Sequence, residues 1–217
     1  MLAFYRIFCY HIGEQNQKVT LMTYYDITQE VFGSRVYPGD PAPKREVLAS
    51  MAAGDLYDLT AFSMCAHNGT HIDAPRHFIK DGKTVDALSL TSTVGFCYVA
   101  LHEGLVTKEV AERILEKAGS VKRILIKGKA TLTYEGAEVF RDAGILLFGN
   151  ESQTVGPEDA PMAVHKLLLS ADVVLLEGVR LGMVPEGNYF LFAAPLLLGD
   201  AEGAPCRAIL ISQETIS

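Results

Sequence analysis

The second half of the chain alternates short apolar runs with amphipathic segments, and this alternation restricts the fold more than any other feature. The apolar runs are 95–101, 123–127, 145–148, 173–177, 189–193 and 208–211. Each is rich in β-branched or aromatic residues and is bounded by Gly, Pro or Asp, which is typical of strands. Because the runs are almost continuously apolar, we expect the strands to be buried on both faces.

Three amphipathic segments predict helices between these strands. Thr107 is expected to cap the first helix, which ends at Gly119. The second helix is expected to end near Gly144, and the third to begin after Pro161. Alternating strands and helices predict a mixed α/β fold. The first half lacks this pattern and predicts strand and loop, with a proline-rich stretch at 37–43.

Length, charge and cysteine usage restrict the class of protein. A chain of 217 residues with 49% apolar residues predicts a single globular domain with a large core. Its net charge is −7 and no basic cluster stands out, so we expect a small-molecule partner and no nucleic acid. Four cysteines without C-x-x-C spacing predict free thiols in a cytoplasmic protein. No apolar run reaches the ~18 residues of a membrane span, so we expect no membrane partner.

The first residues differ from the rest of the chain. Residues 1–21 resemble neither a signal peptide nor the start of a folded domain, whereas Met22 opens the segment MTYYDITQEV. We therefore expect residues 1–21 to be an N-terminal extension and residues 22–217 to form one domain.

The segment HNGTHIDAPRHF, residues 67–78, holds three of the six histidines of the chain. His67 and His71 are four residues apart, but Gly69 and Pro75 disfavour a helix, so we expect an irregular loop. Such a loop can direct His67, His71 and Asp73 toward one point. Two imidazoles and a carboxylate suit Zn²⁺, Mn²⁺ or Fe²⁺.

Three neighbouring residues invite separate interpretations. Asp73 can bridge two ions, because one carboxylate has two oxygens. His77 is a candidate for proton transfer, since the pKa of histidine is ordinarily near neutrality. Cys65 lies in an apolar segment and is interpreted as a packing residue.

The motif H-x-G-T-H-x-D-x-P-x-H resembles the signature of the cyclase family of metal-dependent hydrolases, whose best-known members are bacterial kynurenine formamidases. Other segments resemble the family in the same order. They are YPGD at 37–40, FGNESQTVGP at 148–157, HKLLLSADVVLLEGVRL at 165–181 and FAAPLLLGDAEGAPCRAIL at 192–210. The resemblance covers nearly the whole chain from Met22 onward.

The resemblance implies a role for each matching residue. His67, His71 and Asp73 correspond to ligands of a first metal ion, with Asp73 bridging to a second. His165 corresponds to a ligand of the second ion and Glu177 to a ligand of both. His77 corresponds to the acid/base, and Tyr37 to a substrate-binding residue. The resemblance implies two divalent ions per subunit, Zn or Mn.

The resemblance also implies the fold and the assembly. The expected architecture is a swivelling β/β/α-type single domain with a mixed sheet or barrel-like core. Family members are expected to assemble as dimers or larger homo-oligomers. Without the resemblance, His165 would be only a helix histidine, and Glu177 only a carboxylate at the end of a buried strand. Burying such a carboxylate without a partner is costly.

The implied activity is hydrolysis of an amide-type C–N bond, with N-formyl-L-kynurenine, an intermediate of tryptophan catabolism, as the leading substrate. The chain contains no G-x-S-x-G motif, which argues against a serine nucleophile. Tyr37 stands where the kynurenine formamidases carry Trp, and Glu151 and Gly156 each replace an Asp. An isatin-like cyclic amide or a lactone is therefore an alternative substrate. A metal- or ligand-binding protein without turnover is a further alternative.

Overall fold

The computed structural model describes residues 4–10 and 19–216 and shows a mixed α/β domain. The main sheet contains β1 (Phe4–Tyr10), β2 (Val19–Asp26), β5 (His71–Asp73), β6 (Val94–Leu101), β8 (Arg123–Lys127), β10 (Leu147–Asn150), β11 (Val174–Glu177), β12 (Gly187–Phe192), β13 (Gly203–Pro205) and β14 (Ile209–Ile216). Two smaller sheets pair β3 (Lys44–Ala49) with β4 (Leu59–Ser63) and β7 (Gly104–Val106) with β9 (Ala130–Leu132). The helices are α1 (Leu90–Thr93), α2 (Lys108–Ala118), α3 (Tyr134–Asp142) and α4 (Met162–Ser170), with 3₁₀ turns η1 (Met51–Ala53), η2 (Pro75–His77) and η3 (Val85–Ala87).

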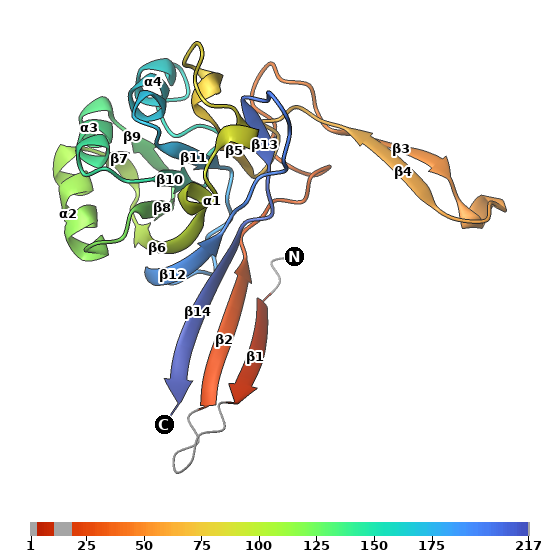
Figure 1. Cartoon of the computed structure of the whole chain (residues 1–217), viewed down its shortest axis with the longest axis horizontal. Coiled ribbons are helices and arrows are strands. Elements are labelled where there is room, and N and C mark those ends of the chain that lie inside the picture. The colour runs from red at the N-terminus through yellow and green to blue at the C-terminus, as the bar shows by residue number, and fades with distance from the viewer. Residues whose placement is uncertain (1–3, 11–18, 217) are drawn as a thin grey trace.

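The strand order of the main sheet is β1-β2-β14-β12-β6-β8-β10-β11-β5-β13. The central strands β6, β8, β10 and β11 run parallel, and the strands on either side of them are antiparallel to their neighbours. Helices α2, α3 and α4 lie together against one side of the parallel strands (Figure 1). This arrangement confirms the mixed α/β prediction.

The parallel strands β8, β10 and β11 are buried on both faces, as predicted from their apolar runs, whereas β6 is only partly buried. On β8, Ile124 and Ile126 pack against the helices, in the same core cluster as Phe140 of α3. Leu125 points to the opposite face and joins a second core cluster. That second cluster also contains Leu210 of β14, which lies far from β8 in the strand order. The sheet therefore curls around this cluster, which gives the barrel-like core that was expected.

The helices begin and end where the sequence predicts. The Thr107 side chain accepts a hydrogen bond from the backbone N–H of Val110, and Gly119 closes α2 with a positive φ of 63°. Helix α3 ends at Asp142, and α4 begins directly after Pro161. None of the described helices is long and apolar enough to cross a bilayer.

The prediction of burial on both faces is wrong for β12 and for both ends of β6, where Phe96 is 67% exposed and Leu101 58%. Tyr189 and Leu191 are buried, whereas Phe190 and Phe192 of the same strand are 36% and 46% exposed. The rings of Phe190 and Phe96, on the neighbouring β6, lie 5.5 Å apart in an edge-to-face contact. Helices α2, α3 and α4 cover the parallel strands and leave this part of the sheet open (Figure 1).

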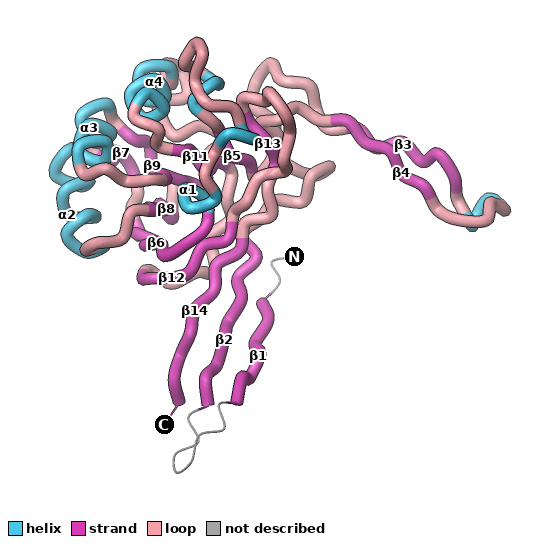
Figure 2. Tube along the Cα trace, in the orientation of Figure 1, coloured by secondary structure: helices cyan, strands magenta, loops and turns pink. Residues whose placement is uncertain are grey.

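Two features of the first half were not specified by the sequence. Strands β3 and β4 form a hairpin that projects from the body of the domain (Figure 2). Strand β1, inside the expected extension at 1–21, pairs antiparallel with β2. Residues 1–3 and 11–18 lie outside the described residues, so the extension stays a prediction.

Candidate metal centre

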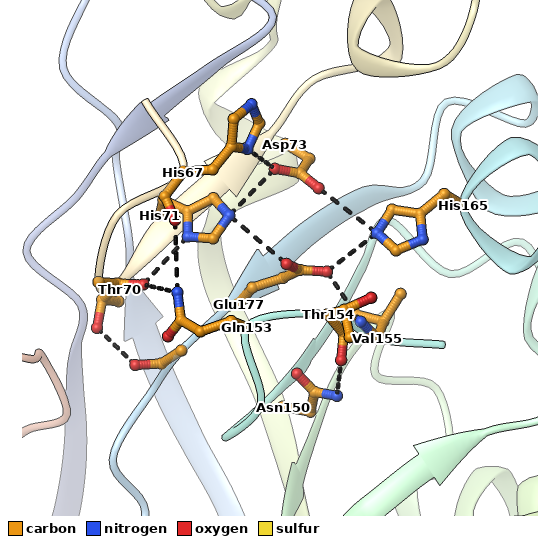
Figure 3. A network of polar contacts seen from close by, with 12 residues as sticks. His67, Thr70, His71, Asp73, Asn150, Gln153, Thr154, Val155, His165 and Glu177 are labelled. Atoms are coloured by element: carbon orange, nitrogen blue, oxygen red, sulfur yellow. Dashed lines mark hydrogen bonds and ion pairs between the residues drawn. The ribbon is translucent and has the colours of Figure 1, made fainter. Parts of the chain in front are cut away.

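Two neighbouring strands and one helix position the predicted ligand residues. On β5, His71 and Asp73 point to one face of the sheet while Ile72 between them points into the second core cluster. Strand β11 runs antiparallel to β5, and Glu177 pairs directly with His71. His165 of α4 faces this pair, so the four polar side chains converge (Figure 3).

This local structure differs in part from the irregular loop that was expected for the motif. His67 lies in a turn, but His71–Asp73 form the short strand β5, because their backbone groups pair with both β11 and β13. The loop prediction is therefore wrong for these three residues. Strand alternation, rather than a loop, places His71 and Asp73 on the same face.

In both Asp73 and Glu177, the two carboxylate oxygens face different histidines. Asp73 Oδ1 lies 2.8 Å from His67 Nδ1 and 3.3 Å from His71 Nε2, while Oδ2 lies 3.8 Å from His165 Nε2. Glu177 Oε2 lies 3.5 Å from His71 Nε2, and Oε1 lies 3.2 Å from His165 Nε2. The ligand atoms form two groups, His67–His71–Asp73 and Asp73–His165–Glu177, each within 4.8 Å. Asp73 belongs to both groups.

Two atoms at the centre of this cluster are buried without a hydrogen-bond partner. They are His71 Nε2 and Asp73 Oδ2. An unpaired buried donor or acceptor is costly, so such atoms call for a further partner. Imidazole nitrogens and carboxylate oxygens are the ligands that Zn²⁺ and Mn²⁺ accept. The residues present therefore fit a divalent cation.

The charges of the cluster favour a cation as well. Burial on its own raises the pKa of Asp73, but the adjacent rings of His67 and His71 outweigh it and hold that pKa well below its usual range. Burial and the charge of Asp73 together raise the pKa of Glu177. Burial lowers the pKa of His67, but its hydrogen bond to Asp73 reverses the effect and raises it to about 9. The cluster therefore binds positive charge, whether a proton or a cation, with high affinity.

Backbone carbonyls hold the outer nitrogens of two histidines. His71 Nδ1 lies 3.1 Å from the Gly69 carbonyl oxygen, and His165 Nδ1 lies 2.9 Å from that of Pro161. A ring that donates its Nδ1–H outward presents an unprotonated Nε2 inward, which is the form that binds a metal. Both rings therefore direct Nε2 toward the carboxylates.

A buried pair of glutamines fixes the backbone around the cluster. Gln153 donates to the Gly69 carbonyl at 3.0 Å, and Gln29 donates to Gln153 and to the Gly178 carbonyl, both at 2.7 Å. Gly178 has a positive φ of 69°, and a Cβ there would lie 2.3 Å from the Gly69 oxygen. The sequence did not single out Gln29, Gln153 or Gly178, because only tertiary contacts bring them together.

The predicted residues meet at one pocket of about 230 Å³. Its lining residues are Tyr37, Asp40, His67, His71, His77, Phe78, Gln153, Thr154, Pro161, His165 and Glu177. Asp73, which is 1% exposed, is not among the lining residues. The Tyr37 hydroxyl donates to the Glu158 carbonyl at 3.3 Å, which holds its segment beside the pocket.

His77 lies beside the cluster rather than within it. Its ring centroid is 4.1 Å from that of His67 and 6.2 Å from that of His165. Burial lowers the pKa of His77 to about 4, well below the near-neutral value on which the sequence analysis relied, so the ring is neutral at pH 7. The 3₁₀ turn η2, which begins at Pro75, places this ring at the pocket.

The remaining residues of interest lie outside the two ligand groups. Cys65 Sγ is 3.8 Å from Asp40 Oδ2 and contacts no ligand group. Glu151 accepts hydrogen bonds from the backbone N–H groups of Gly128 and Leu181 and so has a structural role. Glu202, which the sequence did not single out, lies 3.2 Å from His67 Nε2.

Comparisons with known proteins agree with this geometry. A kynurenine formamidase of Erythrobacter litoralis (strain HTCC2594) is 32% identical over 86% of this chain and 92% of its own length. One from Bacillus anthracis is 35% identical over 80% of this chain and 90% of its own. The structure of a predicted metal-dependent hydrolase from Bacillus stearothermophilus has a TM-score of 0.76 and 29% identity over 88% of this chain and 98% of that one.

Isatin hydrolase A from Labrenzia aggregata shares the fold, with a TM-score of 0.79 at 22% identity, over 89% of this chain and 94% of that one. The model of the Cyclase family matches residues 23–156, which include the whole HNGTHIDAPRHF motif. The ligand geometry, the fold and the sequence all lead to one conclusion: this chain belongs to the Cyclase family.

Proposed function

We propose that the cluster holds two divalent metal ions, Zn²⁺ or Mn²⁺. His67, His71 and Asp73 would hold the first ion, and Asp73, His165 and Glu177 the second, with Glu177 Oε2 also facing the first. The observation that carries this proposal is that one oxygen of each carboxylate faces His71 and the other faces His165. Buried carboxylates in such a geometry are stable only with cations nearby.

We further propose that the protein is an amide hydrolase that converts N-formyl-L-kynurenine to L-kynurenine and formate in tryptophan catabolism. The names of the relatives support this substrate, since kynurenine formamidases match most of the chain. The pocket beside the cluster supports it as well, because it offers Tyr37 and Phe78 as apolar ring surfaces next to the polar groups.

The residues of the chain divide the chemistry between them. A divalent ion, when bound, lowers the pKa of water and polarises a carbonyl oxygen. His77, neutral at pH 7, takes a proton from the attacking water and returns it to the leaving aniline nitrogen. This transfer matters because an anilide anion is a poor leaving group. Tyr37 stacks on the aromatic ring of the substrate and orients it.

A cyclic amide such as isatin, or a lactone, is the second candidate substrate. Tyr37 in place of Trp favours it, because the smaller ring changes the shape of the substrate side of the pocket. The same groups act in the same order on a cyclic amide, with the ring nitrogen as the leaving group. A binding protein without turnover is disfavoured by His77, which such a protein does not need.

We also propose that the protein works in the cytoplasm as a homo-oligomer. The exposed rings of Phe96, Phe190 and Phe192 support the assembly, since contiguous apolar surface marks interaction sites. The described free thiols Cys65, Cys97 and Cys206 support a reducing compartment.

Replacing Asp73 tests the metal centre. We expect Asp73→Asn to fold but to lose both ions, because the neutral amide removes the ligand that the two groups share. Elemental analysis after gel filtration measures the metal content. Asp81→Asn, a change at an exposed aspartate outside the cluster, should keep the wild-type metal content. Full metal content in Asp73→Asn would contradict the assignment.

Formate release tests the substrate. Purified protein loaded with Zn²⁺ or Mn²⁺ should release formate from N-formyl-L-kynurenine, and Asp73→Asn should not. The substrate proposal is wrong if the loaded protein shows no turnover. Hydrolysis of isatin or a lactone, which releases no formate and is followed instead by the absorbance change or acid release on ring opening, would then favour the second candidate.

Replacing His77 separates proton transfer from metal binding. We expect His77→Ala to keep its metal ions but to lose turnover by roughly 10²-fold or more, because general acid–base catalysis contributes about that much. Steady-state kinetics together with metal analysis measures both quantities. Near-normal turnover in the variant would remove His77 from the chemistry.

A further inference from the structure

Each of the three histidines in the cluster has one nitrogen directed inward and one directed outward. For His71 and His165, the outward nitrogen is Nδ1, and its partner is a backbone carbonyl. In His67 the two nitrogens are exchanged, so that Nδ1 faces inward and Nε2 faces outward. Its Nδ1 lies 2.8 Å from Asp73 Oδ1, and its outward Nε2 lies 3.2 Å from Glu202 Oε1. Among these three outward partners, Glu202 is the one that carries a charge.

We propose that Glu202 is a positioning residue that fixes His67 as a metal ligand. When a cation replaces the proton that Nδ1 shares with Asp73, the ring keeps one proton on Nε2, and Glu202 accepts the hydrogen bond from that Nε2–H. A carboxylate behind a ligand histidine both orients the ring and increases its basicity toward the ion. Nδ1 can bind a cation only when it carries no proton, so the tautomer decides whether His67 is a ligand.

The backbone around Glu202 is built to hold this contact. The carbonyl of Glu202 accepts a hydrogen bond from Ala74 N–H at 2.9 Å, one residue beyond β5. The next residue, Gly203, pairs with Asp73 in the sheet, and a Cβ at Gly203 would lie 2.6 Å from His67 Cε1. The imidazole therefore rests against Gly203 while Glu202 binds its outer nitrogen. Strand pairing thus ties Glu202 to the ligand strand itself.

The position of Glu202 separates it from the ligands. Its side chain is 44% exposed, whereas those of Asp73 and Glu177 are 1% and 3% exposed. It belongs to neither group of ligand atoms. Its contact is with the outward nitrogen of His67, on the opposite side of the ring from Asp73. These features are those of a residue that acts through His67.

Metal affinity tests the inference without using any substrate. Apparent Kd values for Zn²⁺ and Mn²⁺ are measured by competition with a chromophoric chelator at neutral pH. We expect Glu202→Ala to weaken binding by about 10- to 100-fold, the usual effect of losing such a partner. Glu202→Gln keeps an oxygen that accepts the hydrogen bond, so it should recover most of the loss. Glu116→Ala, at an exposed glutamate on α2, should match the wild type.

Proton–nitrogen NMR of the histidine rings in the Zn²⁺-loaded protein gives a second measurement. His67 should show a protected Nε2–H in the wild type and in Glu202→Gln, and lose this protection in Glu202→Ala. A change that merely loosened the fold would not be rescued by Gln. Wild-type affinity in Glu202→Ala, with Nε2–H still protected, would overturn the inference.

The inference rests on the proposed metal centre. The binding measurements distinguish a failure of the metal centre from a failure of the role of Glu202. If the wild type binds no metal, both the centre and the role of Glu202 are wrong. If the wild type binds metal and Glu202→Ala binds equally well, only the role of Glu202 is wrong. If Glu202→Gln and Glu202→Ala each lose one whole ion, Glu202 is a ligand and the positioning role is wrong.

Discussion

The proximity of two buried carboxylates, Asp73 and Glu177, is the constraint on which the rest of the structure depends. Both are almost fully buried, and the charge of one raises the pKa of the other. Like charges in a low-dielectric interior are costly unless protons, hydrogen bonds or cations offset them. The surrounding histidines offset part of this cost, and the unpaired atoms at the centre point to the cation that offsets the rest. These features support the proposed metal centre independently of which substrate is hydrolysed.

The fold meets this constraint with regular elements rather than with loops. Glu177 ends the parallel strand β11, and ligands in α/β sheets commonly gather at the carboxyl ends of such strands. The antiparallel pairing of β5 with β11 then sets His71 opposite Glu177. Helix α4 supplies His165. The Gln29–Gln153 pair holds the turn that contains His67 through hydrogen bonds. By contrast, Tyr37 lies in an irregular segment. The part of the pocket that would contact the substrate can therefore differ from protein to protein, while the arrangement of the proposed metal ligands stays the same.

The sequence predicted the parts of this arrangement that depend on local spacing. His67, His71 and Asp73 lie within seven residues, and their chemistry alone indicated a metal. His165 and Glu177 could be assigned only through the family resemblance, because strand pairing and helix packing bring them to the motif. Glu202 and Gln153 went unnoticed for the same reason, since their contacts with His67 and Gly69 span long stretches of chain. The exposed face of β12 was missed because an apolar run does not reveal which of its faces a helix will cover.

The most direct test of the metal centre is anomalous X-ray diffraction from crystals grown with Zn²⁺ or Mn²⁺, with data collected above and below the absorption edge of the metal. Two anomalous peaks are expected. One should lie among His67, His71 and Asp73, and the other among Asp73, His165 and Glu177, with Asp73 contacting both. An absence of peaks in the cluster, with metal bound elsewhere or not at all, would contradict the account.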